Sequence, residues 1–532
     1  MICLTACILA SSTGMGAQQP SGWQISGRVI SSVDGQPLGQ TQVSISSNSD
    51  PNFAEEALTG ADGRFLFRAL AAGKYVLRAK HHGFITQGYE QHGAFFTGIA
   101  VGPGLAAPSL LFRLQPEAVI SGTIVDEAGD PVRDARVMLL HKSLQNGEWA
   151  TRTGDSATSD DRGFYQFGQL LPGRYFVSVN TQPWYARPAP RASVSGGGNA
   201  ALDVAYPITY YQDATDADDA TPIDLQAGEH ATADITLTAV PAQHIVVRMA
   251  ENTAVTGFTA MLSQHVADAG SFSVSTMFQK VAPGVFESSG VPPGSYEMEL
   301  QFYDPKSGRQ GAQERRTVEV SKDAEVDLSM PSAAASVSGT VRFPPAVKPP
   351  AHLAIVLRGG QSQESFAADI SPKGNFHFAQ PILPGRYEIG SSFAEGFYVA
   401  SAVATGATVE GRTLQIRSAD PIVLKVVMTQ GVAQVTGTAV RDGKPVSGAL
   451  VVLVPPDPAN SSPLFRADQS DSDGSFTLPS IVPGRYTVLA VDNGWGLEWR
   501  NPAALKPYLP RGQVLEIAPQ GRYKIKLQVQ DF

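Results

Sequence analysis

Pro172-Gly173-Arg174-Tyr175 is one of five copies of a short phrase in this chain: a small residue or proline, a glycine, a basic residue (serine in the third copy) and a tyrosine. The glycines of successive copies lie 91 to 121 residues apart, the length of a compact domain and too long for a solenoid repeat. A second glycine stands ten or eleven residues before each of them. The other copies are Ala72-Gly73-Lys74-Tyr75, Pro293-Gly294-Ser295-Tyr296, Pro384-Gly385-Arg386-Tyr387 and Pro483-Gly484-Arg485-Tyr486.

Each copy lies near the end of a series of short apolar stretches. A unit opens with an apolar residue, Ser or Thr, Gly, any residue and another apolar residue, as in Ile120-Ser121-Gly122-Thr123-Ile124. A turn and a second apolar stretch follow, and then a segment such as Asp62-Gly63-Arg64-Phe65-Leu66-Phe67, whose period of two places both phenylalanines on one sheet face. Helical spacing is nearly absent. The pattern predicts an all-β chain of about five tandem antiparallel β-sandwiches of the immunoglobulin-like kind.

The tyrosine of the phrase has a structural role in this prediction. Its ring is expected to fill the sandwich core, while its hydroxyl bonds to the backbone at a corner, as in the tyrosine corner of immunoglobulin-type folds. The glycine before it allows a turn that a Cβ atom would obstruct.

The repeat divides the 532 residues into five units with short joints between them. Short joints predict a semi-rigid string of beads, which laid end to end would form a rod on the order of 150 Å long. The third unit lacks a clean opening and is expected to start near His244. The expected divisions are an export signal, complete or truncated, at 1–20, then sandwiches at 21–116, 117–241 with an insertion at 182–222, 242–332, 333–430 and 431–532.

Composition argues against several kinds of partner. The net charge is −9 and no run of Lys or Arg occurs, so the electrostatic footprint of a nucleic-acid-binding protein is missing, and docking on anionic lipid is disfavoured. No stretch beyond the N-terminal segment reaches about 18 apolar residues, so no transmembrane helix is expected. Cysteine is confined to Cys3 and Cys7, which excludes a thiol metal site, a redox pair and a disulfide framework from the body of the chain.

The N-terminal segment indicates export. Its first seventeen residues are apolar, small and uncharged, like the hydrophobic region of a signal peptide, although the usual positive start is missing. Leu4-Thr5-Ala6-Cys7 also resembles a bacterial lipobox with a short apolar lead, in which Cys7 would accept the lipid. We expect a location in the periplasm, at the outer-membrane surface or outside the cell.

The phrase, its upstream Asp-x-Gly-x-Phe-x-Phe segment and the Ser-Gly opening together resemble the carboxypeptidase regulatory-like domain. The resemblance implies a transthyretin-like β-sandwich, found beside metallocarboxypeptidases and in arrays on secreted bacterial proteins, with starch-binding-like and collagen-binding B-type modules as relatives. It covers nearly all of residues 21 to 532, strongly in units one, two, four and five and loosely in unit three. It implies accessory roles, such as stabilising a neighbour, adhesion or carbohydrate contact, and supplies no catalytic residues.

Motifs for catalysis are missing from the sequence. A zinc carboxypeptidase needs His-x-x-Glu and a distant third ligand, and none of the nine histidines begins that motif. Neither a Gly-x-Ser-x-Gly elbow nor a P-loop occurs. His81 and His82 are adjacent, and neighbours on a strand point to opposite faces. We expect no enzymatic activity and no cofactor.

Two groups of aspartates are weak candidates for calcium. Carboxylates bind hard cations, but neither group follows the spaced loop that a glutamate closes. Aspartate is also the ordinary turn former, which is the interpretation we favour. The groups are Asp213, Asp216, Asp218 and Asp219, and Asp468, Asp471 and Asp473.

Aromatic side chains in the two irregular segments, 182–222 and 491–513, are the candidates for carbohydrate contact, because a flat ring stacks on the apolar face of a sugar. We favour a more ordinary interpretation, in which these aromatic side chains fill the ends of sandwiches or the joints between domains, because tryptophan is usually mostly buried. The candidates are Trp184, Tyr185, Tyr210, Tyr211, Trp495, Trp499 and Tyr508.

Three functional hypotheses follow. The first is a non-catalytic secreted or cell-envelope protein with a structural or adhesive role, in which loop aromatics contact polysaccharide. The second is an accessory or regulatory subunit that partners an envelope enzyme or transporter. The third, which nothing in the spacing recommends, is a hydrolase with its site in the 182–222 insertion. The oligomeric state is left open.

Overall fold

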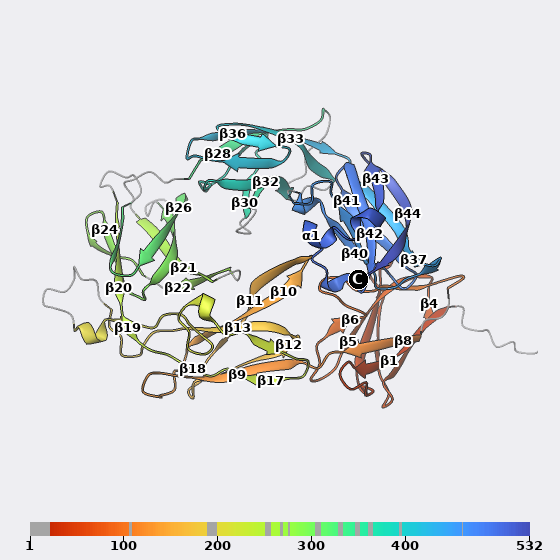
Figure 1. Cartoon of the computed structure of the whole chain (residues 1–532), viewed down its shortest axis with the longest axis horizontal. Helices are drawn as coiled ribbons and strands as arrows, with labels where there is room; N and C mark the ends of the chain where they lie inside the picture. The colour runs from red at the N-terminus through yellow and green to blue at the C-terminus, as the bar shows by residue number, and fades with distance from the viewer. Residues whose placement is uncertain are drawn as a thin grey trace, which may run out of the picture.

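Strands make up most of the described chain, and the prediction of tandem β-sandwiches is confirmed (Figure 1). The description rests on a computed structural model. The residues that it describes are 22–105, 109–188, 199–249, 257–266, 270–274, 277–303, 310–327, 334–345, 352–359, 365–392, 396–459 and 461–532.

The five sandwiches formed by these residues pair their strands in the same way. In the first, the opening strand β1 (Trp23–Ser31) lies between β4 (Arg64–Leu70), antiparallel to it, and β8 (Ser109–Leu114), parallel to it. The tyrosine strand β5 (Gly73–Lys80) pairs with β2 (Gln42–Ser47) in the opposite sheet. Each sandwich therefore contains at least one parallel pair, and the second and fifth contain two, which the antiparallel prediction did not include.

The first three sandwiches contain the following further elements. The first adds β3 (Ala54–Leu58), β6 (Gln87–Gly88) and β7 (Ile99–Val101). The second consists of β9 (Ala118–Val125), β10 (Arg136–Gln145), β11 (Glu148–Thr158), β12 (Phe164–Leu170), β13 (Gly173–Asn180), η2 (Ala200–Leu202), β14 (Val204–Ala205), β15 (Thr209–Tyr210), η3 (Ala217–Asp219), β16 (Ile223–Leu225), β17 (His230–Thr232), β18 (Ile235–Thr236) and β19 (Val240–Pro241). The third consists of β20 (Gln243–Arg248), β21 (Gly257–Val266), β22 (Gly270–Val274), β23 (Gln279–Ala282), β24 (Val285–Val291), β25 (Gly294–Tyr303), β26 (Gln310–Val320) and β27 (Ala324–Asp327).

The last two sandwiches complete the chain. The fourth consists of β28 (Val337–Arg342), β29 (Ala354–Gly359), β30 (Ser365–Asp369), β31 (Asn375–His377), β32 (Gly385–Ser392), β33 (Phe397–Thr405), β34 (Thr408–Glu410), β35 (Thr413–Ile416) and β36 (Ile422–Gln430). The fifth consists of β37 (Ala433–Arg441), β38 (Lys444–Pro445), β39 (Leu450–Val454), η4 (Ser462–Leu464), β40 (Arg466–Gln469), β41 (Ser475–Ile481), β42 (Gly484–Asp492), η5 (Gly494–Gly496), α1 (Pro502–Leu505), η6 (Leu509–Arg511), β43 (Gln513–Ile517) and β44 (Arg522–Asp531).

The recurring tyrosine closes a corner in all five sandwiches, as predicted. Each ring is buried in its own hydrophobic core, and each hydroxyl donates to the carbonyl four residues earlier. A buried phenol needs such a partner, and this one is local, so the corner forms wherever the phrase occurs. The bonds run from Tyr75 to Ala71 (3.0 Å), Tyr175 to Leu171 (2.8 Å), Tyr296 to Pro292 (2.8 Å), Tyr387 to Leu383 (2.9 Å) and Tyr486 to Val482 (2.8 Å).

The glycine of the opening strand makes room for the aromatic strand beside it. A Cβ atom on Gly437 would lie 2.5 Å from the ring of Phe476 and 2.5 Å from the Ile525 carbonyl oxygen. Gly339 has the same surroundings in the fourth sandwich, 2.5 Å from the Phe376 ring. The Ser-Gly opening and the Gly-x-Phe segment therefore belong to one packing unit, which explains why they recur together.

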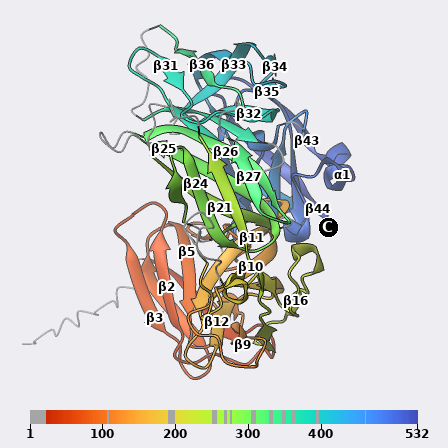
Figure 2. The same cartoon turned by 90° about the vertical axis from the view of Figure 1, so that its left-hand side faces the viewer.

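The sandwiches form a closed circuit in which the first and fifth lie side by side, so the prediction of an extended rod is wrong (Figure 1). From the side, the third sandwich lies between the first two below and the fourth above (Figure 2). Hydrogen bonds across more than 370 residues of sequence close the circuit, for instance from Ala100 N–H to Ser472 Oγ at 2.8 Å. These contacts between the first and fifth sandwiches hold the array closed.

Candidate functional site

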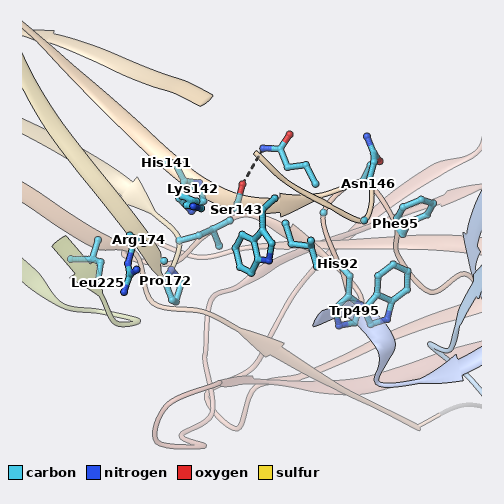
Figure 3. A pocket seen from close by; sticks show the side chains of 18 of the residues that line it. His92, Phe95, His141, Lys142, Ser143, Asn146, Pro172, Arg174, Leu225 and Trp495 are labelled. Atoms are coloured by element: carbon cyan, nitrogen blue, oxygen red, sulfur yellow. Dashed lines mark hydrogen bonds between the residues drawn. The ribbon is translucent and has the colours of Figure 1, made fainter. Parts of the chain in front are cut away.

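A cavity of about 1160 Å³ lies where the first, second and fifth sandwiches meet. The tip of the β10–β11 hairpin and the β13–β16 pair form one side of it. The loop that carries His92 and Phe95, together with Trp495 of the fifth sandwich, forms the other (Figure 3). Because three sandwiches contribute, the cavity exists only while the circuit is closed.

The insertion of the second sandwich fixes where this cavity can open. On the outer face of β10 and β13, Leu140 packs against Ile208 and Tyr210, so the insertion covers that half of the face. Beyond Leu140 the same face continues through Lys142 and Leu144, which line the cavity. The insertion therefore covers the part of this face around Leu140, and the part that carries Lys142 and Leu144 is available to a ligand.

The hairpin tip carries the most exposed aromatic ring of the cavity. Asn146 and Gly147 form its two-residue turn with φ of 49° and 77°, as expected for an Asn-Gly hairpin turn. Trp149, paired with Leu144 across the strands, is 54% exposed. Its indole N–H donates to Glu498 Oε1 of the fifth sandwich at 3.1 Å, so the ring is held in place across the domain boundary.

A row of charged side chains crosses the sheet on the same face as Trp149. Lys142, Arg174 and Asp224 stand directly opposite one another on β10, β13 and β16. Arg174 binds Asp224 through two hydrogen bonds, of 2.7 and 3.0 Å. The row carries two positive charges and one negative charge.

Two stacked histidines flank the cavity. The His92 ring lies parallel to Trp495 with 4.7 Å between centroids, and its Nδ1 donates to Gln469 Oε1 at 3.2 Å. The His141 ring stacks on Tyr175 at 4.4 Å. Burial lowers the pKa of both imidazoles, because desolvation disfavours their charged form. Near neutral pH both rings are therefore expected to be neutral.

The boundary between the first and fifth sandwiches is polar and well bonded. Asp471 accepts from Gly98 N–H at 2.9 Å and forms an ion pair with Lys74. Gln469 donates to the Glu90 carbonyl and to Thr97 Oγ1, both at 2.7 Å. These contacts position the His92 loop against Trp495.

Arg500 joins the fifth sandwich to the second and faces the fourth. Its backbone N–H donates to the Gly147 carbonyl at 3.2 Å, and its guanidinium lies 5.1 Å from the Trp499 ring centroid and 3.9 Å from Glu148. Glu388 of the fourth sandwich is close enough to interact electrostatically with it. Burial raises the pKa of Glu388 to about 7, against the opposing charges of Arg412, Arg358 and Arg500.

This raised pKa predicts that stability falls with pH. The folded protein holds the Glu388 proton up to about pH 7, whereas the ordinary glutamate value is 4.5. The stabilisation is therefore complete below pH 4.5 and is lost as pH rises through 7, by roughly 3 kcal/mol. In Glu388→Gln that loss should disappear. Hydrogen exchange of β32 at pH 5 and pH 8 measures it, and an equal pH dependence in both proteins would contradict the assignment.

The aromatic candidates of the insertion occupy different environments. Trp184 is 86% exposed and Tyr185 donates to Glu127 Oε1 at 2.5 Å. Tyr210 is 2% exposed, and the partly buried Tyr211 packs against the core of the second sandwich.

The candidates of the fifth sandwich lie at its boundaries. Trp499 is 5% exposed and packs under Gly147, where a Cβ would lie 2.3 Å from the indole. Trp495 stacks on His92, and Tyr508 packs, half-buried, in the small cluster that Trp499 belongs to. Sequence reasoning did not single out Trp149, although the Asn146-Gly147 turn marks the hairpin that presents it.

The aspartate candidates act in turns and contacts. Asp213 Oδ1 accepts from Thr236 N–H at 2.6 Å, and Asp216 caps η3, which contains Asp218 and Asp219, by accepting from Asp218 N–H at 3.0 Å. In the fifth sandwich, Asp473 accepts from Ser475 N–H at 3.0 Å. Among the described residues, no group of three or more His, Cys, Asp or Glu side chains is placed to hold a metal ion.

The described part of the chain contains no helix of the length and apolarity that a membrane crossing requires. The segment 1–20, with its expected export signal and Cys7, lies outside the described residues, as do 189–198 of the insertion.

Comparison with solved structures finds chains of low similarity. The minor pilin GBS52 of Streptococcus agalactiae is 12% identical over 41% of this chain and 97% of its own, with a TM-score of 0.22. The TIE protein of Bacillus anthracis is 12% identical over 97% and 76%, with a TM-score of 0.18. BcpA, the major pilin subunit of Bacillus cereus, is 8% identical over 77% and 99%, with a TM-score of 0.15.

Among curated proteins, no match to this sequence was found. A family match was found at the N-terminal side: residues 24–108 and 119–238 match the carboxypeptidase regulatory-like domain. These ranges lie within the first two sandwiches, each of which contains its own tyrosine corner. For the first two sandwiches, this match confirms the carboxypeptidase regulatory-like domain that the sequence motifs predicted.

Proposed function

We propose that this protein is a non-catalytic, exported component of the cell envelope that binds saccharide in the cavity between its first, second and fifth sandwiches. The observation that carries the proposal is Trp149, a half-exposed indole held in orientation by Glu498 inside a cavity of about 1160 Å³. A fixed aromatic platform with a few polar groups around it suits a sugar ring, whose faces are apolar and whose edge is polar. Export is supported by the N-terminal sequence pattern.

The side chains around this platform suit binding better than catalysis. His141 stacks on Tyr175, and the Ser143 hydroxyl accepts a hydrogen bond from Gln145 at 3.1 Å. A serine nucleophile would instead share its proton with a histidine. Asp203 of the insertion contacts His244 of the third sandwich, whose side chain is buried at the joint between the two sandwiches.

Retention of the intact protein on a panel of immobilised polysaccharides tests the proposal. Trp149→Ala should weaken binding about thirtyfold, the effect of losing a tryptophan anchor. Trp149→Phe keeps an apolar ring and should retain most of the affinity. Trp184→Ala is the matched control, because it removes an exposed tryptophan outside the cavity. Undiminished binding by Trp149→Ala would overturn the site, and a panel without any retention would overturn the function.

A second candidate function, docking of an envelope protein, is favoured by Trp184. Its ring is 86% exposed on the insertion, in edge contact with Tyr185 at 5.7 Å. An exposed tryptophan is a typical anchor in protein interfaces. Co-purification of an envelope enzyme or transporter that depends on Trp184 would support this accessory role.

A further inference from the structure

The charged row beside Trp149 specifies what kind of saccharide the cavity accepts. We propose that the ligand is an acidic saccharide, with a uronate carboxylate bound at Lys142 and Arg174 and its sugar ring on Trp149. The inference rests on the proposed function, because it assigns a chemical class to the same site.

The first argument is a surplus positive charge on the sheet. Lys142 and Arg174 stand directly opposite each other on β10 and β13, an arrangement of like charges that destabilises a sheet. Asp224 offsets only one of them, since both of its oxygens accept from Arg174. Within the described residues, the Lys142 ammonium has no hydrogen-bond or ion-pair partner. A ligand carboxylate between the two cations would supply the missing negative charge.

The second argument is the chemistry of the pair. Arg174 is already oriented by its two bonds to Asp224, so its guanidinium is fixed before a ligand arrives. Lys142 adds a mobile ammonium that can follow a carboxylate in more than one position. The edge of the guanidinium that Asp224 does not occupy, together with the flexible Lys142 ammonium, suits a carboxylate attached to a ring.

The third argument is the distance between the charge and the platform. Lys142 and Leu144 lie on the same face of β10, two residues and therefore about 7 Å apart along the strand. Trp149 is the cross-strand partner of Leu144. That separation is comparable to one sugar residue, so a ring stacked on the indole would place its acidic substituent near the row.

The protein carboxylate beside Trp149 already has hydrogen-bond partners and does not compete with a ligand for the two cations. Glu498, the carboxylate beside Trp149, accepts from the indole N–H at 3.1 Å and from Asn501 Nδ2 at 3.0 Å. Figure 3 shows His141, Lys142 and Arg174 gathered at one end of the cavity, with Phe95, His92 and Trp495 at the other. The cavity therefore has a basic end and an aromatic end, although the whole chain has a net charge of −9.

Titration calorimetry of the full chain with trimers of galacturonate, glucuronate and mannuronate, each beside its methyl ester, tests this inference. The ester keeps the sugar and removes the charge. At least one acid should bind about tenfold more tightly than its ester, the effect of a charge-assisted hydrogen bond. The difference should shrink at 0.5 M salt, where charges are screened.

Lys142→Gln should abolish the preference for the acid while the ester binds as before. Lys373→Gln, at an exposed turn of the fourth sandwich, is the matched control and should bind like the wild type. If acid and ester bind equally, or if Lys142→Gln keeps the preference, the inference is overturned and saccharide binding stands. If neither these trimers nor any polysaccharide on the panel binds, the proposed function fails as well. Thermal unfolding shows that each variant is folded.

Discussion

The double variant Asp471→Lys/Gly147→Asn should open the circuit and lengthen the molecule. We expect the radius of gyration to rise from about 25–30 Å for the closed form toward about 40 Å for an extended array of five globules. Small-angle X-ray scattering measures this change directly.

The first substitution acts at the boundary between the first and fifth sandwiches. Asp471 accepts from Gly98 N–H at 2.9 Å and pairs with Lys74, so a lysine there removes an acceptor and sets two ammonium groups against each other. Repulsion within a partly buried contact is costly, because little water is present to screen it.

The second substitution introduces a steric clash between the second and fifth sandwiches. Gly147 has φ of +77°, a conformation that asparagine tolerates, so the hairpin turn should survive. A Cβ at this position would lie 2.3 Å from the Trp499 ring, which is fixed in its own cluster. The fifth sandwich therefore has to move away. Two substitutions are needed because the linked domains have a high effective concentration, which can keep a single weakened contact closed.

Matched changes outside the boundaries provide the control. Asp161→Lys reverses the charge of an exposed turn residue, and Gly129→Asn places asparagine at φ of +84° where a Cβ meets nothing within 4 Å. This double variant should scatter like the wild type. If the Asp471→Lys/Gly147→Asn protein keeps the wild-type radius while its sandwiches stay folded, the boundary contacts do not hold the circuit.

Sequence reasoning succeeded where the determinants are local. The bond from Tyr175 to the Leu171 carbonyl spans four residues, so one short phrase contains the whole corner. The opening glycine and the aromatic strand also lie within one unit, as for Gly437 and Phe476. Such patterns recur with each sandwich and can be recognised from one copy to the next.

The circuit and its cavity could not be predicted in this way. Lys74 and Asp471 are 397 residues apart, and nothing in the sequence around either of them indicates that they meet. The stack of His92 on Trp495 likewise joins two irregular loops, to which no period applies. Trp149 lies on a strand and has no aromatic residue next to it in the sequence, whereas Trp184 is followed by Tyr185. The importance of Trp149 comes from Glu498, almost 350 residues later.

His244→Leu should destabilise the third sandwich by about 3–5 kcal/mol, the cost of removing one partner from a buried pair. The imidazole is 2% exposed and bridges two acids, with Nδ1 2.7 Å from Glu287 Oε1 and Nε2 3.0 Å from Asp203 Oδ2. Glu287 belongs to β24 of the third sandwich, whereas Asp203 belongs to the insertion of the second. One side chain therefore stabilises both a sheet and a joint.

Hydrogen exchange measures the stability of the third sandwich by itself. A denaturation curve of the whole chain would also contain the unfolding of the other four sandwiches. Opening of β24 should become easier, and its amides should exchange at least a hundredfold faster. His377→Leu, on the exposed face of β31 in the fourth sandwich, should change stability by less than about 0.5 kcal/mol.

A second variant separates loss of the hydrogen-bonded bridge from loss of the shape of the side chain. In His244→Leu/Glu287→Leu the buried carboxylate is removed together with its partner, and two apolar side chains fill the space. Because the single change removes the hydrogen bond between His244 Nδ1 and Glu287 and sets the buried carboxyl group against an apolar side chain, the double variant should regain at least half of the lost stability. If it is instead less stable than His244→Leu, packing of the imidazole rather than its bridge holds the joint. If His244→Leu exchanges at the wild-type rate in β24, neither account survives, and the joint depends on its backbone contact from Ala242 N–H to the Asp203 carbonyl at 2.9 Å.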